Sequence, residues 1–164
     1  MQKGDPRVIS GWTMYDWANS VYSLTITSAV FPVFYAAITI DGDLDKVMDR
    51  YGLPAMSLYS YVISASFLLI ALVAPILSGI ADHTGQKKKF LKAFCYLGAL
   101  SCAGLFFFDV DHLWLGLMFA MLASIGYSGS LIFYDAFLPE IAEPKDHDRI
   151  SARGYMMGYI GSVF

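Results

Sequence analysis

The sequence predicts an all-α membrane protein, because its charged residues are few and lie between long uncharged segments. Of the 164 residues, 57% are hydrophobic and 15% are charged, whereas a soluble domain has about 25% charged residues. Uncharged segments cover residues 17–40, 51–81, 93–108 and 113–134. A helix that crosses a membrane needs about 20 mainly apolar residues, and three of these segments reach that length. The segment from residue 93 reaches it with the three residues before it, because Lys92 can extend to the interface.

Four complete spans and one partial span follow from this pattern. We predict helical spans over residues 11–40, 57–81, 90–108 and 113–137, and an apolar segment over residues 151–164. As a helix the last segment would rise only about 21 Å, whereas the hydrocarbon core is about 30 Å thick. We therefore expect residues 1–164 to be the N-terminal part of a longer bundle. Prolines at positions 32 and 75 are expected to bend the first two spans, and Pro139 to end the fourth.

The basic residues predict the orientation of the chain. Nine of the eleven lie in three segments that share one side of the membrane. They are Lys3, Arg7, Lys87, Lys88, Lys89, Lys92, Lys145, Arg149 and Arg153. The opposite side has Lys46 and Arg50. Because Lys and Arg collect on the cytoplasmic side, we predict a multi-pass protein with a cytoplasmic N-terminus, in the inner or plasma membrane if the source is bacterial.

A polar stripe runs along the first predicted span. Its members fall within roughly 100° of one another around a helix. They are Asp16, Asn19, Ser20, Ser23 and Thr27. Contact with lipid would be costly, so we expect the stripe to face the bundle interior or a water-filled cavity. The alternative is ordinary hydrogen bonding between helices, and Asp16 could instead interact with the start of its own helix.

The fourth span has a polar side and a small-residue side. Ser124, Ser128 and Asp135 share one face, and we expect them to line the same cavity, although Asp135 could instead be solvated at the interface. The opposite face consists of small residues that admit a close neighbouring helix. These are Ala123, Gly126, Gly129 and Ser130.

The fifth segment repeats this small-residue pattern in Gly154-x-x-x-Gly158 and has Arg153 at its cytoplasmic end. That arginine could neutralise Asp135 or Asp16 across the bundle, or it could be a plain cytoplasmic anchor.

The connection after the second span predicts a compact charged turn. Asp82 stands at a helix end, where it can accept hydrogen bonds from a neighbouring helix start or pair with a base. Gly85 permits the tight reversal of the chain, and Lys87 opens a basic cluster. The alternative is a simple cytoplasmic anchor.

Several function classes lack support in the sequence. All three histidines lie in predicted connections, and there is no Cys/His cluster with zinc spacing, no phosphate-binding loop and no G-x-S-x-G motif. We therefore predict no enzyme, no metal, no cofactor and no nucleic-acid partner.

Four segments resemble a known family. Residues 78–91 are similar to the G-x-L-A-D-R-x-G-R-K signature between the second and third helices of the major facilitator superfamily. The departures from it are Ser78, His83 and Gln86. Residues 15–20 (Tyr-Asp-Trp-Ala-Asn-Ser) resemble a signature of the vacuolar-effluxer-like branch, the autophagy-related amino-acid effluxers. Residues 134–141 and 151–161 are similar to its fourth and fifth helices, with Asp135 where Asn is expected.

This resemblance implies a secondary transporter of about twelve helices in two six-helix halves, working by alternating access. Residues 1–164 would supply helices one to four and the start of five. The first and fourth helices would line the cavity, and Asp82, Gly85, Lys87 and Arg153 would belong to a cytoplasmic gate. Expected partners are a small solute such as an amino acid, a coupling proton on Asp16 or Asp135, membrane lipid and the C-terminal half of the protein. The alternatives are a non-transporting membrane scaffold and, with less support, a membrane-embedded enzyme.

Overall fold

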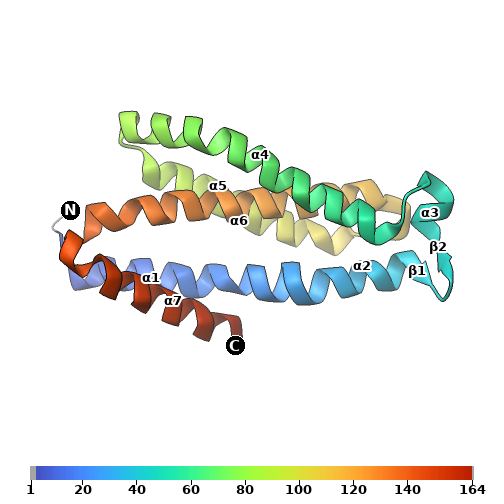
Figure 1. Ribbon diagram of the computed structural model, residues 1–164, viewed down its shortest axis with the longest axis horizontal. Helices are drawn as coiled ribbons and strands as arrows, with labels where there is room; N and C mark the ends of the chain where they lie inside the picture. Colours follow the sequence, from blue (N-terminus) through green and yellow to red (C-terminus); the bar gives the residue numbers. More distant parts are fainter. Residues whose placement is uncertain (1–2, 164) are drawn as a thin grey trace. The chain divides into compact units, whose positions relative to one another are not determined.

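The computed structural model describes residues 3–163, and its long elements are helices joined by short connections (Figure 1). The helices are α1 (Pro6–Val21), η1 (Tyr22–Val30), α2 (Phe31–Thr39), α3 (Lys46–Tyr51), α4 (Ala55–Thr84), α5 (Lys87–Gly104), α6 (Leu113–Ile141) and α7 (His147–Val163). Short 3₁₀ turns are η2 (Leu105–Phe107), η3 (Val110–His112) and η4 (Pro144–Asp146), and a two-stranded antiparallel hairpin consists of β1 (Ile40–Asp41) and β2 (Leu44–Asp45). The predicted all-α fold is confirmed.

Within the described residues, four helical segments are long and apolar enough to cross a membrane. They are Pro6–Thr39, Ala55–Thr84, Lys87–Phe107 and Val110–Ile141. Each contains one of the four predicted complete spans, or nearly all of it, and most extend beyond the predicted ends. The contacts divide the chain into a terminal unit (Met1–Pro32 and Tyr134–Phe164) and a central unit (Val33–Phe133). The boundaries fall inside the first and the fourth span.

The first span begins at Pro6, earlier than the predicted residue 11. The Asp5 carboxylate caps the helix by accepting a hydrogen bond from the Arg7 backbone N–H at 2.9 Å. A proline at the first helical position needs no hydrogen-bond partner for its nitrogen, so this Asp-Pro pair starts the helix in the polar N-terminal segment.

The same span widens into a π-helix, η1, which ends two residues before Pro32. Proline has no N–H to donate to the carbonyl one turn back, and its ring crowds that carbonyl. Side chains supply hydrogen bonds nearby, because the Ser28 hydroxyl donates to the Ser23 carbonyl at 2.8 Å and the Ser23 hydroxyl to the Ser20 carbonyl at 3.1 Å. The structural consequence of Pro32 is thus a stretch of wider turns.

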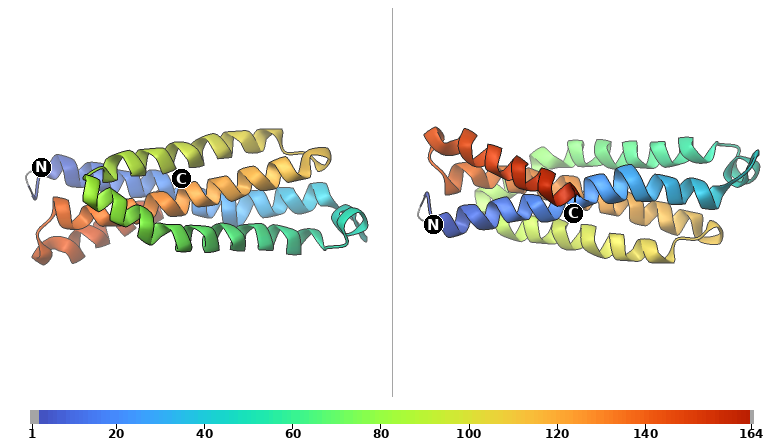
Figure 2. Two further views of the ribbon diagram at one scale, coloured as in Figure 1. Left: turned by 90° about the horizontal axis from the view of Figure 1, so that it is seen from above. Right: turned by 90° about the horizontal axis from the view of Figure 1, so that it is seen from below.

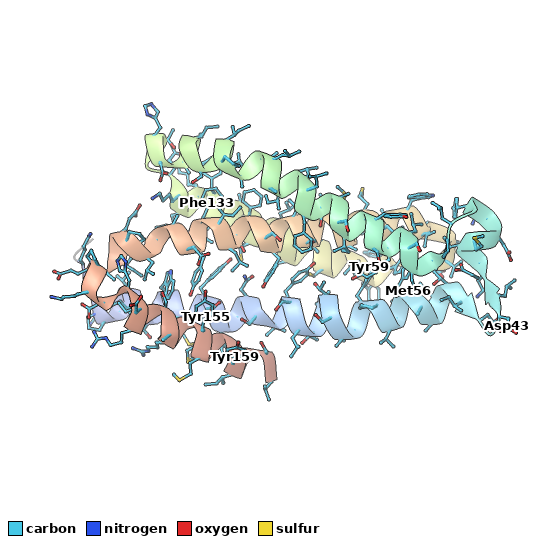
Figure 3. The ribbon with its side chains drawn as sticks, viewed as in Figure 1. Asp43, Met56, Tyr59, Phe133, Tyr155 and Tyr159 are labelled. Carbon is cyan, nitrogen blue, oxygen red and sulfur yellow. The ribbon has the colours of Figure 1, made fainter. Side chains whose placement is uncertain are left out.

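In the central unit, the small-residue face of α6 packs closely on α5, as the sequence predicts. A Cβ added to Gly126 would collide with the backbone of Gly98, and one added to Gly129 would collide with the Phe94 ring. Ala123 and Ser130 are each 1% exposed. One turn further along α6, Phe133 (labelled in Figure 3) stacks on Phe90 and Phe94 of α5, with ring centroids 5.3 and 5.8 Å away.

A small cap joins α2 to α4 within the central unit (Figure 2). It consists of the β1–β2 hairpin and α3. One Asp45 carboxylate oxygen accepts hydrogen bonds from the backbone N–H groups of Val47 and Met48, both at 2.9 Å, and the other accepts from Ala55 at 2.8 Å. Asp45 therefore caps α3 and also fixes the first residue of α4.

Two further helix ends differ from the predicted bounds by a few residues. Helix α6 continues through Pro139 to Ile141, and α7 begins at His147 instead of residue 151. A proline removes one backbone donor, and the following turn still closes because the Ala142 N–H donates to the Leu138 carbonyl at 3.1 Å. Pro139 therefore lies in the last turn of the helix and does not end it.

Candidate functional site

The polar stripe of the first span lies partly against α7, in the terminal unit. Helix α7 runs beside α1 (Figure 2). A Cβ added to Gly158 would lie 2.7 Å from the Ser20 hydroxyl oxygen and 3.1 Å from an Asp16 carboxylate oxygen. Asp16 and Ser20 therefore face the backbone of α7 at Gly158, where the absence of a side chain leaves room for them. Part of the stripe is therefore a helix-packing surface, and the cavity-facing role of the stripe stays a prediction.

Two further glycines extend this contact surface along α7. A Cβ on Gly154 would lie 2.9 Å from the Trp12 ring and 3.0 Å from the Tyr134 hydroxyl oxygen. One on Gly161 would collide with the Trp17 carbonyl. The predicted small-residue pattern of the fifth segment thus packs against α1, and it extends one turn beyond the predicted pair.

Tyr134 lies at the centre of an aromatic stack. The Trp12 and Tyr134 rings have centroids 4.3 Å apart and planes 8° from parallel. The Tyr15 ring lies 5.4 Å from that of Tyr134 at an angle of 26°. The Trp12 indole N–H also donates to the Tyr134 carbonyl oxygen at 3.0 Å. The stack holds the end of α6 firmly against α1.

None of these three aromatic residues is among the site residues predicted from the sequence. A signal was present, because Tyr15-Asp16 and Tyr134-Asp135 are the same dipeptide in two spans. In the structure the two tyrosines stack, and the carboxylates of Asp16 and Asp135 are near enough to the Tyr134 hydroxyl to interact with it electrostatically. Aromatic residues in spans are mostly packing or interface residues, so nothing in composition alone separated these from the rest.

Two polar groups of this cluster are buried without a hydrogen-bond partner among residues 3–163. They are the Tyr134 hydroxyl and the Asn19 side-chain N–H₂. Tyr134 is only 4% exposed. Leaving a buried donor or acceptor unsatisfied costs about 1–3 kcal/mol, so native proteins normally satisfy such groups with protein, water or ligand. The cluster of Asp16, Asn19 and Tyr134 therefore has hydrogen-bonding capacity that the described chain leaves unused.

The remaining predicted cavity residues lie in different environments. In the terminal unit, Ser23 and Thr27 are half-buried on η1, and Asp135 is exposed at the end of α6. In the central unit, Ser128 is half-buried and Ser124 is 2% exposed. The Ser66 hydroxyl of α4 donates to the Ser124 hydroxyl at 2.8 Å. The hydroxyl of Ser124 is therefore part of the packing between α4 and α6, and its place on a cavity wall stays a prediction.

The connection between α4 and α5 forms the compact charged turn that the sequence predicts. Gly85 has a φ of +65°, a left-handed conformation that glycine adopts without strain, and ends α4. The Asp82 carboxylate pairs with the Lys87 ammonium at 2.8 Å. The sequence left two partners open for Asp82, the start of a neighbouring helix or a basic side chain. The structure has the basic side chain.

Arg153 belongs to α7 of the terminal unit. Its side chain is exposed, and it forms no ion pair with any residue from 3 to 163. The ion pair with Asp16 or Asp135 is therefore not formed, which favours the anchor interpretation of Arg153. In the same part of the chain, no three His, Cys, Asp or Glu side chains gather as metal ligands would.

Comparison with known proteins identifies the family. A family profile described as "Vacuole effluxer Atg22 like" matches residues 4–164. The chain belongs to the Atg22-like vacuole effluxer family. It is 39% identical, over 99% of its length, to the "Uncharacterized MFS-type transporter YxiO" of Bacillus subtilis (strain 168) and covers 37% of that protein. It is also 26% identical, over 87% of its length, to "Autophagy-related protein 22" of Pyricularia oryzae, of which it covers 24%.

The chain thus spans little more than a third of the length of the Bacillus relative. No solved structure matches it. Membership of the Atg22-like family confirms the branch inferred from residues 15–20, 134–141 and 151–161. Together with the four apolar helices, it identifies a multi-pass membrane protein. The prediction that the chain belongs to a family of transporters and not of enzymes is confirmed as well.

Proposed function

We propose that the protein is a secondary transporter that moves a small solute across the membrane by alternating access, with amino acids as the solute class. The observation that carries the proposal is the unused hydrogen-bonding capacity of Tyr134 and Asn19 beside Asp16. Ionisable and polar groups within spans are costly and mark solute or ion pathways. The family's description as vacuole effluxers supports the direction of movement.

An amino acid carries both an ammonium and a carboxylate, and the cluster offers groups for each. The carboxylates of Asp16 and Asp135 would accept hydrogen bonds from the ammonium. The Asn19 N–H₂ and the Tyr134 O–H would donate to the carboxylate. In transporters of this architecture the site is completed by the opposite half of the bundle. We propose the same here, with the rest of the protein supplying the other wall.

Asp16 or Asp135 would also carry the coupling proton, because a carboxylate in a span can be neutralised by binding one. The turn that pairs Asp82 with Lys87 would act as a cytoplasmic gate around Gly85, and Arg153 would anchor α7 on the same predicted side of the membrane. This assignment follows the predicted orientation, in which the N-terminus is cytoplasmic and the membrane, if the source is bacterial, is the inner or plasma membrane.

The test is solute counterflow with the complete protein in proteoliposomes. Vesicles loaded with an unlabelled amino-acid mixture are assayed for uptake of radiolabelled amino acids, with and without a pH gradient. Asp16→Asn is expected to lower uptake severalfold and to remove the response to the gradient, without loss of inserted protein. Asp49→Asn, an exposed acid on α3 of the cap, is the matched control and is expected to behave as wild type.

Uptake of no labelled amino acid by the wild-type protein would reject this solute class. Unchanged kinetics for Asp16→Asn would remove Asp16 from the site.

A second candidate function, a non-transporting scaffold, is favoured by specific contacts. Ser124 is bonded to Ser66, and Ser20 packs on Gly158, so some polar groups of the spans serve helix packing. Cysteine substitution at Ser23 and at Ser128 separates the two functions. Reaction with a membrane-impermeant thiol reagent at either position indicates a water-filled pathway, and protection at both favours the scaffold.

A further inference from the structure

Four lysines lie in the first turns of α5, and three of them have no acidic partner within residues 3–163. Lys87 is the exception in this cluster, because its ammonium pairs with Asp82 at 2.8 Å. Lys88, Lys89 and Lys92 are exposed, and none of them forms an ion pair with any residue between 3 and 163. They also lie in the first turns of a helix, where the backbone N–H groups add positive potential. This end of α5 is therefore a concentrated, uncompensated positive surface.

The other basic residues predicted on the same side are different. Lys145 pairs with Glu143 at 2.8 Å, and Arg149 pairs with Asp146 at 3.0 Å. The Lys145–Glu143 pair raises the pKa of the Lys145 ammonium and lowers that of the Glu143 carboxyl. Lys3 also lies near Glu143. A residue that serves only to orient a span can be accompanied by an acid in this way, so the unpaired lysines of α5 need a separate explanation.

The lysines continue into an apolar stripe on the same helix. Residues four apart on a helix lie one above the other, and this relation connects Lys88, Lys92, Tyr96 and Leu100. Tyr96 is 65% exposed and Leu100 is 71% exposed. From the polar end toward the membrane interior, the stripe thus presents cationic side chains, an aromatic ring and then an aliphatic side chain.

We propose that this face of α5 is a binding site for an anionic phospholipid. Lys88, Lys89 and Lys92 hold the phosphate and the anionic headgroup, and one acyl chain lies along Tyr96 and Leu100. Charge complementarity selects an anionic headgroup, because three cations without acidic partners attract phosphate strongly. The apolar stripe selects a lipid over a soluble anion, which would leave Tyr96 and Leu100 without a contact. The proposal depends on the chain spanning a membrane and not on its solute or orientation.

The experiment compares lipid retention by the complete protein in detergent, using native mass spectrometry. Wild-type protein is equilibrated with equal amounts of phosphatidylglycerol and phosphatidylcholine of the same acyl chains. The variant K88Q/K89Q/K92Q removes three unpaired charges. The matched control K3Q/K145Q/R149Q removes three charges from the same predicted side, where acids accompany the bases.

Each lysine near an anionic lipid surface contributes about fivefold in affinity, so the loss expected for the triple variant is on the order of 100-fold. The control variant is expected to retain phosphatidylglycerol as the wild type does. Equal losses in the two variants, or no preference of the wild type for phosphatidylglycerol, would overturn the proposal.

Single variants keep the test informative if the triple variant inserts poorly. K88Q and K92Q are each expected to reduce retention of phosphatidylglycerol about fivefold. L100S should also reduce it, because the acyl chain loses its apolar contact. If L100S retained phosphatidylglycerol fully while the lysine variants lost it, the site would be one for phosphate groups alone and the phospholipid proposal would be wrong.

Discussion

Trp12 lies flat against Tyr134 and donates its indole N–H to the carbonyl oxygen of the same residue, so one side chain makes both a stacking contact and a hydrogen bond. The two residues are 122 positions apart in the sequence. Through this pair, the start of the first span is joined to the end of the fourth, immediately beside Asp135. The geometry of the candidate site therefore depends on Trp12, an uncharged residue.

The two contributions of Trp12 can be separated by substitution. Trp12→Phe keeps an aromatic ring for stacking but removes the N–H, so it is expected to destabilise the complete protein by about 1 kcal/mol, the net value of a typical hydrogen bond. Trp12→Ala removes both and is expected to cost about 3–5 kcal/mol. Unfolding measured in detergent by thermal scanning would show this order. Trp114→Phe, at a position 55% exposed, serves as the control, and equal stability of Trp12→Phe and wild type would contradict the role of the hydrogen bond.

The contact between α7 and α1 predicts a size limit at Gly158. Valine at this position would place its Cβ 2.7 Å from the Ser20 hydroxyl oxygen, so Gly158→Val is expected to destabilise the protein by about 1–3 kcal/mol through overpacking. The smaller change Gly158→Ala should cost less and should be partly rescued by Ser20→Gly, which removes the opposing hydroxymethyl group. Stability of the four proteins of this cycle measures the coupling.

The control for this series is Gly11→Ala in α1, where an added Cβ meets nothing within 4 Å. Its stability should equal or slightly exceed that of the wild type, because alanine has the higher helix propensity. Additive effects of Gly158→Ala and Ser20→Gly would show that the two residues are not in contact.

The cap between α2 and α4 predicts a stability difference that depends on pH. Partial burial by itself raises the pKa of the Asp45 carboxyl, but three hydrogen bonds from the Ala55, Met48 and Val47 N–H groups lower it, and the net pKa lies below the ordinary 3.8. A carboxyl with a lowered folded-state pKa stabilises the protein above its unfolded value. This stabilisation is full above roughly pH 4–5 and is lost as the pH falls through the folded-state pKa, below 3.8.

Asp45→Ala is therefore expected to cost about 0.5–2 kcal/mol at neutral pH, as loss of a helix cap does, and progressively less below the ordinary carboxyl pKa. Thermal unfolding of the complete protein across this pH range measures the difference. Asp43→Ala is the control at the tip of the hairpin, where the carboxyl is exposed (Figure 3). A wild-type advantage over Asp45→Ala that stays constant down to pH 3 would contradict the assignment.

The sequence determined the spans, the small-residue faces and the family, because each depends on residues close together in the chain. Length and apolarity set the four membrane-crossing segments. Helical spacing placed Gly126 and Gly129 on one face and Gly154 and Gly158 on another, and both faces do receive a neighbouring helix. Residues 78–91 likewise contain their own turn residue, Gly85, and their own ion pair between Asp82 and Lys87.

Only the tertiary structure decided which polar residues are already partnered. Helical spacing fixes the side of the helix on which Ser124 lies, but not what the neighbouring helix presents to it, and Ser66 is 58 positions away. The same limit hid Tyr134, whose importance comes from Trp12 across the fold. The spacing of residues along one helix gives the direction in which each side chain leaves the helix axis. A hydrogen bond between two helices depends also on the distance between the side chains that they bring together. That distance exists only once the helices have packed.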